Sequence, residues 1–390
     1  MTGQAAAGSA VFAQADAAVA VGDLITAARL IEEVLAQEDA EHGLEGWLKL
    51  AGLRRALRQP RKALEAVHGA LRHAPLDFVA LCLRAGLLEK LDPDQAGEAW
   101  AEALAQKPDG PLLPGMAAAI AAGEAWRDRW EQRREARLAE ATRVAATQGS
   151  ADQAWKIERF RSNVLRKSRV WHSEPTHYHY PGLVEREFHP RERFPWLAEV
   201  EAATSVIRAE METALRSSRA ELVPYLQYSD HEALAQWREL NKNPDWTAIH
   251  LIKRGEVVRA NADLCPETMA ILARLPQPEI PGASPNAMFS LLAPGKTIPP
   301  HVGVNNTRLL CHLPLVVPEG CWFRVGGETR AWREGEAFVF DDTIEHEAAN
   351  PSDQLRVVMI FDLWHPDLAL AEQQAVAALV AADGAQDSGL

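Results

Sequence analysis

The stretch Ile298-Pro-Pro-His-Val-Gly-Val-Asn-Asn-Thr-Arg-Leu-Leu-Cys-His-Leu-Pro-Leu315 contains two histidines in different settings. His301 follows two prolines, and Gly303 stands two residues later, where a metal site often has a carboxylate. His312 lies in the apolar run 308–317, whose composition predicts a β-strand. His301, placed just before that strand, is either a metal ligand without an acidic partner or an ordinary loop histidine.

The segment around this stretch is rich in predicted strands. After Trp246, short apolar runs alternate with turn signals such as Pro318-Glu-Gly320 and Gly326-Gly327. The predicted strands cover residues 247–252, 288–293, 308–317, 321–325, 336–340 and 355–363. Many short strands with such breaks favour a sandwich or jelly roll. A helical apolar stripe within residues 194–219 precedes them.

The first hundred residues contain an internal repeat. One set of apolar residues, with offsets of 4, 7 and 8, recurs at periods of 36 and 33 residues. The set comprises Ala27, Ile31, Val34 and Leu35, then Ala63, Val67, Ala70 and Leu71, then Ala96, Trp100, Ala103 and Leu104. These offsets place one stripe on a helix. Pro75 and Pro108 each fall 12 residues after the repeat alanine, where a helix would end.

Each of these helices follows another apolar helix across a short break. Paired helices with a period of about 34 residues resemble tetratricopeptide repeats, although a generic helical bundle is an alternative. A repeat array has a concave face suited to peptides or partner proteins, so it predicts recruitment and no chemistry of its own.

Composition limits the remaining function classes. The chain has 390 residues, enough for at least two domains, and its 41 basic and 54 acidic residues give a net charge of −13. This charge argues against nucleic acid as the main partner. No apolar run approaches the length of a membrane span, and no basic segment precedes the alanine-rich N-terminus, so we expect a cytoplasmic protein. The four scattered cysteines predict reduced thiols.

These patterns predict an α+β multidomain chain. We expect a helical repeat domain over residues 1–109, a charged helical linker over 110–175, a jelly-roll domain over 176–375 and a tail over 376–390. The boundary near residue 175 follows the change to the turn-rich, aromatic segment that begins at Trp171.

Three residues in the strand-rich segment could form one site. His346 follows His301 by 45 residues, and Arg356 follows His346 by 10. Two neutral imidazoles with open positions suit Fe(II), and an arginine offers a fixed fork for a carboxylate. This arrangement is typical of 2-oxoglutarate oxygenases. Arg356 could instead form an ion pair with Asp342 or Glu347, and His301 could be structural.

Residues 176–370 resemble the aspartyl/asparaginyl β-hydroxylase family, whose oxygenase domain is a double-stranded β-helix of the jelly-roll or cupin-like type. The motifs that carry the resemblance are Pro181-Gly-Leu183, Phe194-Pro-Trp-Leu197, Ser290, His301-Val-Gly303, Arg308-Leu-Leu-Cys-His312, Phe340-Asp-Asp342, Glu345-His-Glu347, Arg356 and Trp364-His-Pro366. Because these motifs occur in order along the chain, the resemblance is specific.

The resemblance implies an iron centre without a carboxylate ligand. His301 and His346 would hold Fe(II), with Gly303 at the vacant position, and O2 would be the oxidant. Some iron halogenases also lack the carboxylate, and nothing else in this sequence supports halogenation. Asp341 and Asp342 fit turn or strand-end roles better than the role of a missing ligand.

The resemblance also implies a set of cosubstrate contacts. Ser290 and Arg356 would hold the distal carboxylate of 2-oxoglutarate, while His312 would lie near its C1 carboxylate. Trp246 matches a tryptophan that lines the cosubstrate pocket. Alternatively, His312 is a hydrogen-bonded core residue and Ser290 an ordinary strand serine.

One position departs from the family pattern. Members that hydroxylate aspartate often show Arg-x-Arg-x-His, and this chain has Leu310 in place of the second arginine. Arg308, the first arginine, is the predicted substrate-binding residue. The family's second arginine lies close to substrate, so Leu310 puts the substrate's identity in question.

We therefore predict a 2-oxoglutarate-dependent dioxygenase in which His301, His346 and Arg356 are the catalytic residues. The favoured reaction is β-hydroxylation of an aspartyl or asparaginyl residue in a peptide or protein presented by the helical array. The alternatives are hydroxylation of a lipid acyl chain or small metabolite, and a non-catalytic scaffold.

Overall fold

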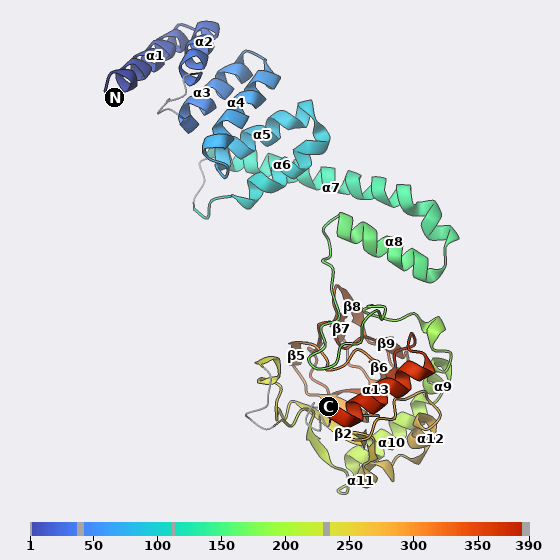
Figure 1. Ribbon diagram of the computed structural model, residues 1–390. Coiled ribbons are helices and arrows are strands. Elements are labelled where there is room, and N and C mark those ends of the chain that lie inside the picture. Colours follow the sequence, from blue (N-terminus) through green and yellow to red (C-terminus); the bar gives the residue numbers. More distant parts are fainter. Residues whose placement is uncertain (1, 37–42, 111–113, 229–234, 384–390) are drawn as a thin grey trace. The chain divides into compact units, whose positions relative to one another are not determined.

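The computed structural model describes residues 2–36, 43–110, 114–228 and 235–383 (Figure 1). The chain divides into two compact units, Met1–Ile157 and Glu158–Leu390. This division falls inside the predicted linker 110–175, within helix α8 (Ala151–Val164). Among the described residues, no helix combines the length and apolar composition that crossing a bilayer requires.

The N-terminal unit is entirely helical. Its complete helices are α1 (Thr2–Ala20), α2 (Leu24–Leu35), α3 (Gly43–Ala56), α4 (Pro60–His73), α5 (Phe78–Leu91), α6 (Pro93–Ala105) and α7 (Pro114–Gln148). Successive helices pack as the pairs α1 with α2, α3 with α4 and α5 with α6. This is the tetratricopeptide-like architecture that the repeat predicts.

The repeated apolar stripe occupies the second helix of each pair. Ala27 and Ile31 in α2, like Ala63 and Val67 in α4, are completely buried. The helix starts follow from local chemistry: the Asp23 carboxylate accepts a hydrogen bond from the Thr26 amide, and Pro60 begins α4, where its missing amide hydrogen costs nothing. Helices α4 and α6 end before Pro75 and Pro108, as predicted.

The C-terminal unit combines helices with two β-sheets. Its helices after α8 are α9 (Leu197–Ala202), α10 (Thr204–Arg216), α11 (Arg259–Ala262), α12 (Pro266–Leu272) and α13 (Leu370–Asp383). Its strands are β1 (Leu222–Pro224), β2 (Trp246–Lys253), β3 (Glu256–Val257), β4 (Ala287–Leu292), β5 (Lys296–His301), β6 (Arg308–Val316), β7 (Trp322–Val325), β8 (Glu328–Ala331), β9 (Phe338–Phe340), β10 (His346–Asn350) and β11 (Arg356–Trp364).

All strand pairs are antiparallel. The larger sheet has the order β1-β2-β4-β11-β6-β9, with β3 paired to β2, and the smaller sheet has the order β5-β10-β7-β8. From β4 onward the strands alternate between the two sheets, except at the paired strands β7 and β8, so the chain winds a double-stranded β-helix, and the predicted jelly-roll class is confirmed.

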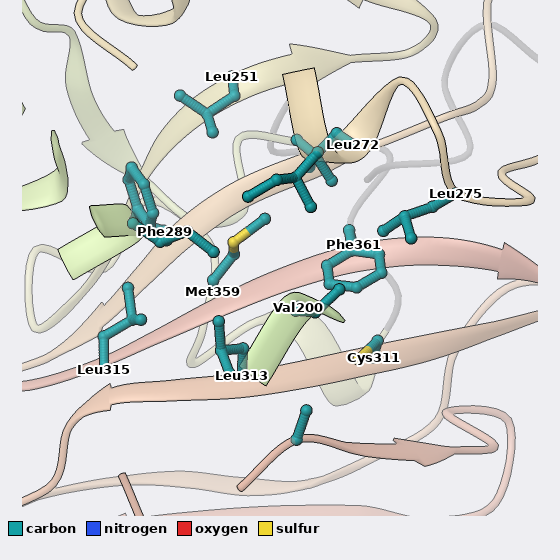
Figure 2. Close-up of a cluster of buried hydrophobic side chains, with 14 of the residues drawn as sticks. Val200, Leu251, Leu272, Leu275, Phe289, Cys311, Leu313, Leu315, Met359 and Phe361 are labelled. Atoms are coloured by element: carbon teal, nitrogen blue, oxygen red, sulfur yellow. The ribbon is translucent and has the colours of Figure 1, made fainter. Parts of the chain in front are cut away.

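The larger sheet separates two apolar cores. On its outer face, Phe289, Leu313 and Met359 pack with Val200 of α9 and Leu272 of α12 (Figure 2). Its inner face packs against the smaller sheet, so that residues such as Ile360 and Phe323 share a second core. Because side chains alternate along a strand, β4, β6 and β11 supply residues to both cores. The site described below opens between the two sheets.

Several local predictions were wrong. His301, which was placed just before the strand 308–317, itself ends β5, a strand that was not predicted and whose prolines are tolerated because it is an edge strand. The short strands β1, β3, β5, β8 and β10 were missed, because their sequences lack a clear alternating apolar pattern. The stripe within 194–219 forms two helices that meet at Ala203, and Leu215 on it is exposed.

Candidate active site

Two adjacent strands bring His301 and His346 together. His301 ends β5, His346 begins β10, and the two residues are direct partners in the antiparallel ladder. Their imidazole ring centroids are 4.1 Å apart, and both side chains are buried. These two residues, which are far apart in the sequence, therefore form one pair at the edge of the smaller sheet.

The hydrogen bonds of this pair select the tautomer that a metal needs. Nδ1 of His301 lies 2.7 Å from the carbonyl oxygen of Pro299, and Nδ1 of His346 lies 3.1 Å from that of Ile344. A carbonyl only accepts, so Nδ1 carries the hydrogen in both rings and Nε2 keeps its lone pair. Backbone contacts of this kind orient metal-binding histidines.

Burial keeps both rings neutral at ordinary pH. It lowers the pKa of His301 to about 4, and it lowers the pKa of His346 well below its usual value, with the neighbouring His301 contributing. A neutral imidazole is the form that binds a metal ion. The donor chemistry of the pair thus fits a divalent iron.

In the described part of the chain, no acidic side chain joins this pair as a third ligand. Among the residues that the structure describes, no cluster of three or more His, Cys, Asp or Glu side chains could hold a metal ion. A β-carbon at Gly303 would lie 2.2 Å from Oδ2 of Asp342, so the space for a side chain at position 303 is filled. The geometry accords with a two-histidine centre.

Arg356 lies on the same cavity, at the start of β11. It is almost fully buried, and Nη1 donates to the carbonyl oxygen of Ser290 at 3.4 Å, while Nε has no hydrogen-bond partner. Burial lowers its pKa to about 10, so it remains a cation at neutral pH. Neither Asp342 nor Glu347, nor any other described carboxylate, forms an ion pair with it; Asp342 pairs with Arg308 and Glu347 with Arg324.

Ser290 and Trp246 border this arginine. The indole Nε1 of Trp246 donates to the hydroxyl oxygen of Ser290 at 3.0 Å, which leaves the hydroxyl hydrogen available for an acceptor. Tyr225 stacks on Trp246 with ring centroids 3.9 Å apart. A buried cation beside an available hydroxyl is a good carboxylate site.

His312 lies in an aromatic box on β6. Its ring centroid is 4.7 Å from that of Phe340 and 5.0 Å from that of Phe323. Burial, and secondarily the charge of Arg356, lower its pKa well below the usual value, and Nδ1 has no hydrogen-bond partner. A bound group could satisfy a buried polar atom of this kind.

One cavity collects six of the seven predicted site residues. Trp246, Ser290, His301, His312, His346 and Arg356 all line it. It is narrow, with a volume of about 50 Å³. The sequence did not predict three aromatic residues that line the cavity, namely Tyr225, Phe323 and Trp332. Nothing in the local sequence around them marks a site, and only the packing of the two sheets brings them here.

Arg308 is the seventh predicted residue, and it does not line the cavity. Its guanidinium lies 3.3 Å from carboxylate oxygens of both Asp342 and Asp362, and all three side chains are buried. Burial raises the pKa of Asp342 to about 6, against the opposing effect of Arg308. The structure thus places Arg308 behind Asp342.

Known proteins resemble this part of the chain. Residues 201–366 match the family model described as Aspartyl/Asparaginyl beta-hydroxylase. The human Aspartate beta-hydroxylase domain-containing protein 2 is 39% identical over 149 residues, which are 37% of this chain and 40% of that protein. The human Aspartyl/asparaginyl beta-hydroxylase is 30% identical over 190 residues, 47% of this chain and 24% of that protein.

A bacterial relative carries a different name. The Ornithine lipid ester-linked acyl 2-hydroxylase of Rhizobium tropici is 34% identical over 197 residues, 50% of this chain and 66% of that protein. The chain thus spans less than half the length of the human relatives named above and about two thirds of the bacterial one. The region that matches the family model carries all seven predicted site residues, and the predicted resemblance of this region to the aspartyl/asparaginyl β-hydroxylase family is confirmed.

Proposed function

We propose that this protein is a dioxygenase that uses Fe(II), 2-oxoglutarate and O2 to hydroxylate an unactivated C–H bond. One observation carries the proposal. Two neutral histidines, each with the hydrogen on Nδ1 and the lone pair on Nε2, share a cavity with a buried arginine that has no acidic partner among the described residues. A redox metal with open positions and a dicarboxylate would satisfy both features at once.

The chain's own residues would bind and orient these components. Nε2 of His301 and Nε2 of His346 would hold the iron, and the guanidinium of Arg356 would hold the distal carboxylate with the Ser290 hydroxyl. Iron with 2-oxoglutarate and O2 supplies the oxidising power, and the by-products are succinate and CO2. The aromatic walls would limit the access of water, and Nδ1 of His312 would be available to a polar cosubstrate atom.

Two substrate classes are open to this chemistry. An aspartyl or asparaginyl residue in a peptide agrees with the names of the human relatives, and the tetratricopeptide-like helices would then recruit the peptide. An acyl chain agrees with the name of the bacterial relative and with the many apolar residues that line the cavity.

The test begins with the cosubstrate. We expect protein purified without oxygen, reconstituted with Fe(II) and then given O2 to convert 2-oxoglutarate to succinate and CO2 at a low rate without substrate, and His346→Ala to abolish this conversion. His179→Ala is the matched control, because His179 is exposed and outside the cavity. Turnover that is absent, or that survives in His346→Ala, would favour a scaffold over an enzyme.

A further inference from the structure

We propose that the group oxidised in this cavity is an uncharged aliphatic chain, such as the acyl part of a larger molecule, and not the side chain of an aspartyl residue. This inference rests on the proposed function and names its substrate class. Two independent features of the cavity support it: its charges are already balanced, and the wall that remains is apolar.

The charges at the site cancel before a substrate enters. Arg356 is the only lysine or arginine that lines the cavity in the described part of the chain. Arg308 lies behind Asp342 and is balanced there by Asp342 and Asp362. Among Arg356, Arg308, Asp342 and Asp362 the two cations equal the two anions, and Glu347, which also lines the cavity, is paired with Arg324. The two charges of Fe(II) would equal those of 2-oxoglutarate.

A second carboxylate would therefore enter without a counter-charge. It would be desolvated in a narrow cavity next to Asp342, and an unpaired buried charge is strongly unfavourable. Among the described residues that line the cavity, an aspartyl side chain would find no cation other than Arg356, which 2-oxoglutarate would already occupy.

The remaining wall suits methylene groups. Aliphatic side chains from five different elements or loops line it, namely Leu226, Ile298, Val304, Leu310 and Ile360. Phe323 and Phe340 line the same cavity, and its two acidic side chains, Asp342 and Glu347, are paired with Arg308 and Arg324. Apolar walls with a few placed polar groups favour an apolar ligand of defined orientation.

Leu310 is the position that decides between the two substrate classes. On β6, Arg308, Leu310 and His312 occupy alternate positions, and Leu310 and His312 both line the cavity. A cation at position 310 would stand within this wall, between the balanced Arg308 cluster and His312. Leucine at this point keeps the wall aliphatic.

The proposed reaction balances. One oxygen atom of O2 is inserted into a C–H bond of the chain, which becomes C–OH. The other oxygen atom enters succinate as the bond between C1 and C2 of 2-oxoglutarate breaks and C1 leaves as CO2. Of the electrons that reduce O2, the hydroxylated C–H bond supplies two and the decarboxylated 2-oxoglutarate supplies the other two.

The first experiment compares substrates with the full chain, Fe(II) and 2-oxoglutarate. The probes are glyceryl monolaurate and two peptides that differ only in carrying Asp or Asn at one position. We expect a gain of one oxygen on the lauroyl chain, with 2-oxoglutarate consumption raised at least about tenfold. Oxygen gained by either peptide and not by the lauroyl chain would overturn the inference while leaving the proposed function intact.

The second experiment needs no metal and no turnover. Calorimetric titration of the metal-free protein with glyceryl monolaurate should show binding with a negative heat-capacity change, because apolar surface is buried. We expect Leu310→Arg to weaken this binding at least about tenfold and Leu310→Met to change it less than about threefold. Leu310→Gln serves if the arginine variant does not fold. Equal affinity in all the folded variants would overturn the inference even if the enzyme proves inactive.

Discussion

The carboxylate of Asp342 occupies the space next to the backbone of Gly303, where a β-carbon would lie only 2.2 Å from Oδ2. The two residues are also joined by their backbones, because the Gly303 amide donates to the Asp342 carbonyl oxygen at 2.7 Å. Asp342 is in turn held by Arg308. Glycine at position 303 therefore offers no side chain that could bind a metal, and it is also required by the packing of this site.

A carboxylate placed at position 303 should not complete a three-ligand metal centre. In Gly303→Asp the new side chain collides with Asp342, so we expect the C-terminal unit to lose about 1–3 kcal/mol of unfolding free energy and to gain no affinity for Co(II). Urea unfolding and the visible spectrum of bound Co(II) measure the two effects. Gly52→Ala, at an open helical position, controls for the loss of a glycine. Tighter Co(II) binding with a changed spectrum would contradict this account.

Removal of either histidine should abolish metal binding. We expect His301→Ala and His346→Ala each to lower Fe(II) or Co(II) affinity at least about 100-fold, since a two-ligand site has no spare donor. His179→Ala should bind normally, because that side chain is exposed. Titration under anaerobic conditions gives the affinities, and retention of tight binding in His301→Ala would assign the metal to other residues.

The sequence predicted the fold class because periodicity is local. The alanine-centred repeats determine which face of α2, α4 and α6 is buried, and six apolar runs correspond to six observed strands. The strands that escaped prediction are short or polar: β5 contains two prolines and β10 reads His-Glu-Ala-Ala-Asn. Their conformation is imposed by pairing with neighbours, which no local pattern encodes.

The candidate site was predictable where it rests on motif spacing. His301, His346 and Arg356 were found in this way, and the structure brings them to one cavity. The aromatic wall of Tyr225 and Trp332 was not found, because those residues meet the site only through the packing of the two sheets. The pairing of Arg308 with Asp362, 54 residues away, was hidden for the same reason.

Arg356 should strengthen the binding of 2-oxoglutarate and lower the stability of the protein without cosubstrate. Its buried charge lacks an acidic partner among the described residues, so Arg356→Met should raise the unfolding free energy of the protein without cosubstrate, by about 1 kcal/mol or more. The same variant should lose about 2–5 kcal/mol of 2-oxoglutarate binding, because the carboxylate loses its cation.

Unfolding in urea and 2-oxoglutarate titration of the metal-loaded protein test this pair of effects. Arg333→Met is the control, because Arg333 is largely exposed and outside the cavity, and it should change neither quantity by more than about 0.5 kcal/mol. A destabilised Arg356→Met with unchanged 2-oxoglutarate affinity would mean that Arg356 is a structural residue.

His250 should make the C-terminal unit sensitive to acid. It is buried on β2, neither ring nitrogen has a hydrogen-bond partner, and burial lowers its pKa to about 4. The unfolded chain, with a histidine pKa near 6.5, therefore binds a proton that the folded chain does not between about pH 6.5 and pH 4. The contribution of a neutral His250 is fully present above about pH 6.5 and is lost as the pH falls to about 4.

Replacing this histidine by leucine should remove that dependence. At pH 5 the proton linkage at His250 costs the wild type about 2 kcal/mol, whereas at pH 7.5 it costs almost nothing. The difference in unfolding free energy between His250→Leu and wild type should therefore move in favour of the variant by about 2 kcal/mol between pH 7.5 and pH 5. Urea unfolding at the two pH values measures this shift, with His179→Leu, at an exposed position, as the control. A shift of the opposite sign would mean that His250 is protonated in the folded protein and has found an acceptor there.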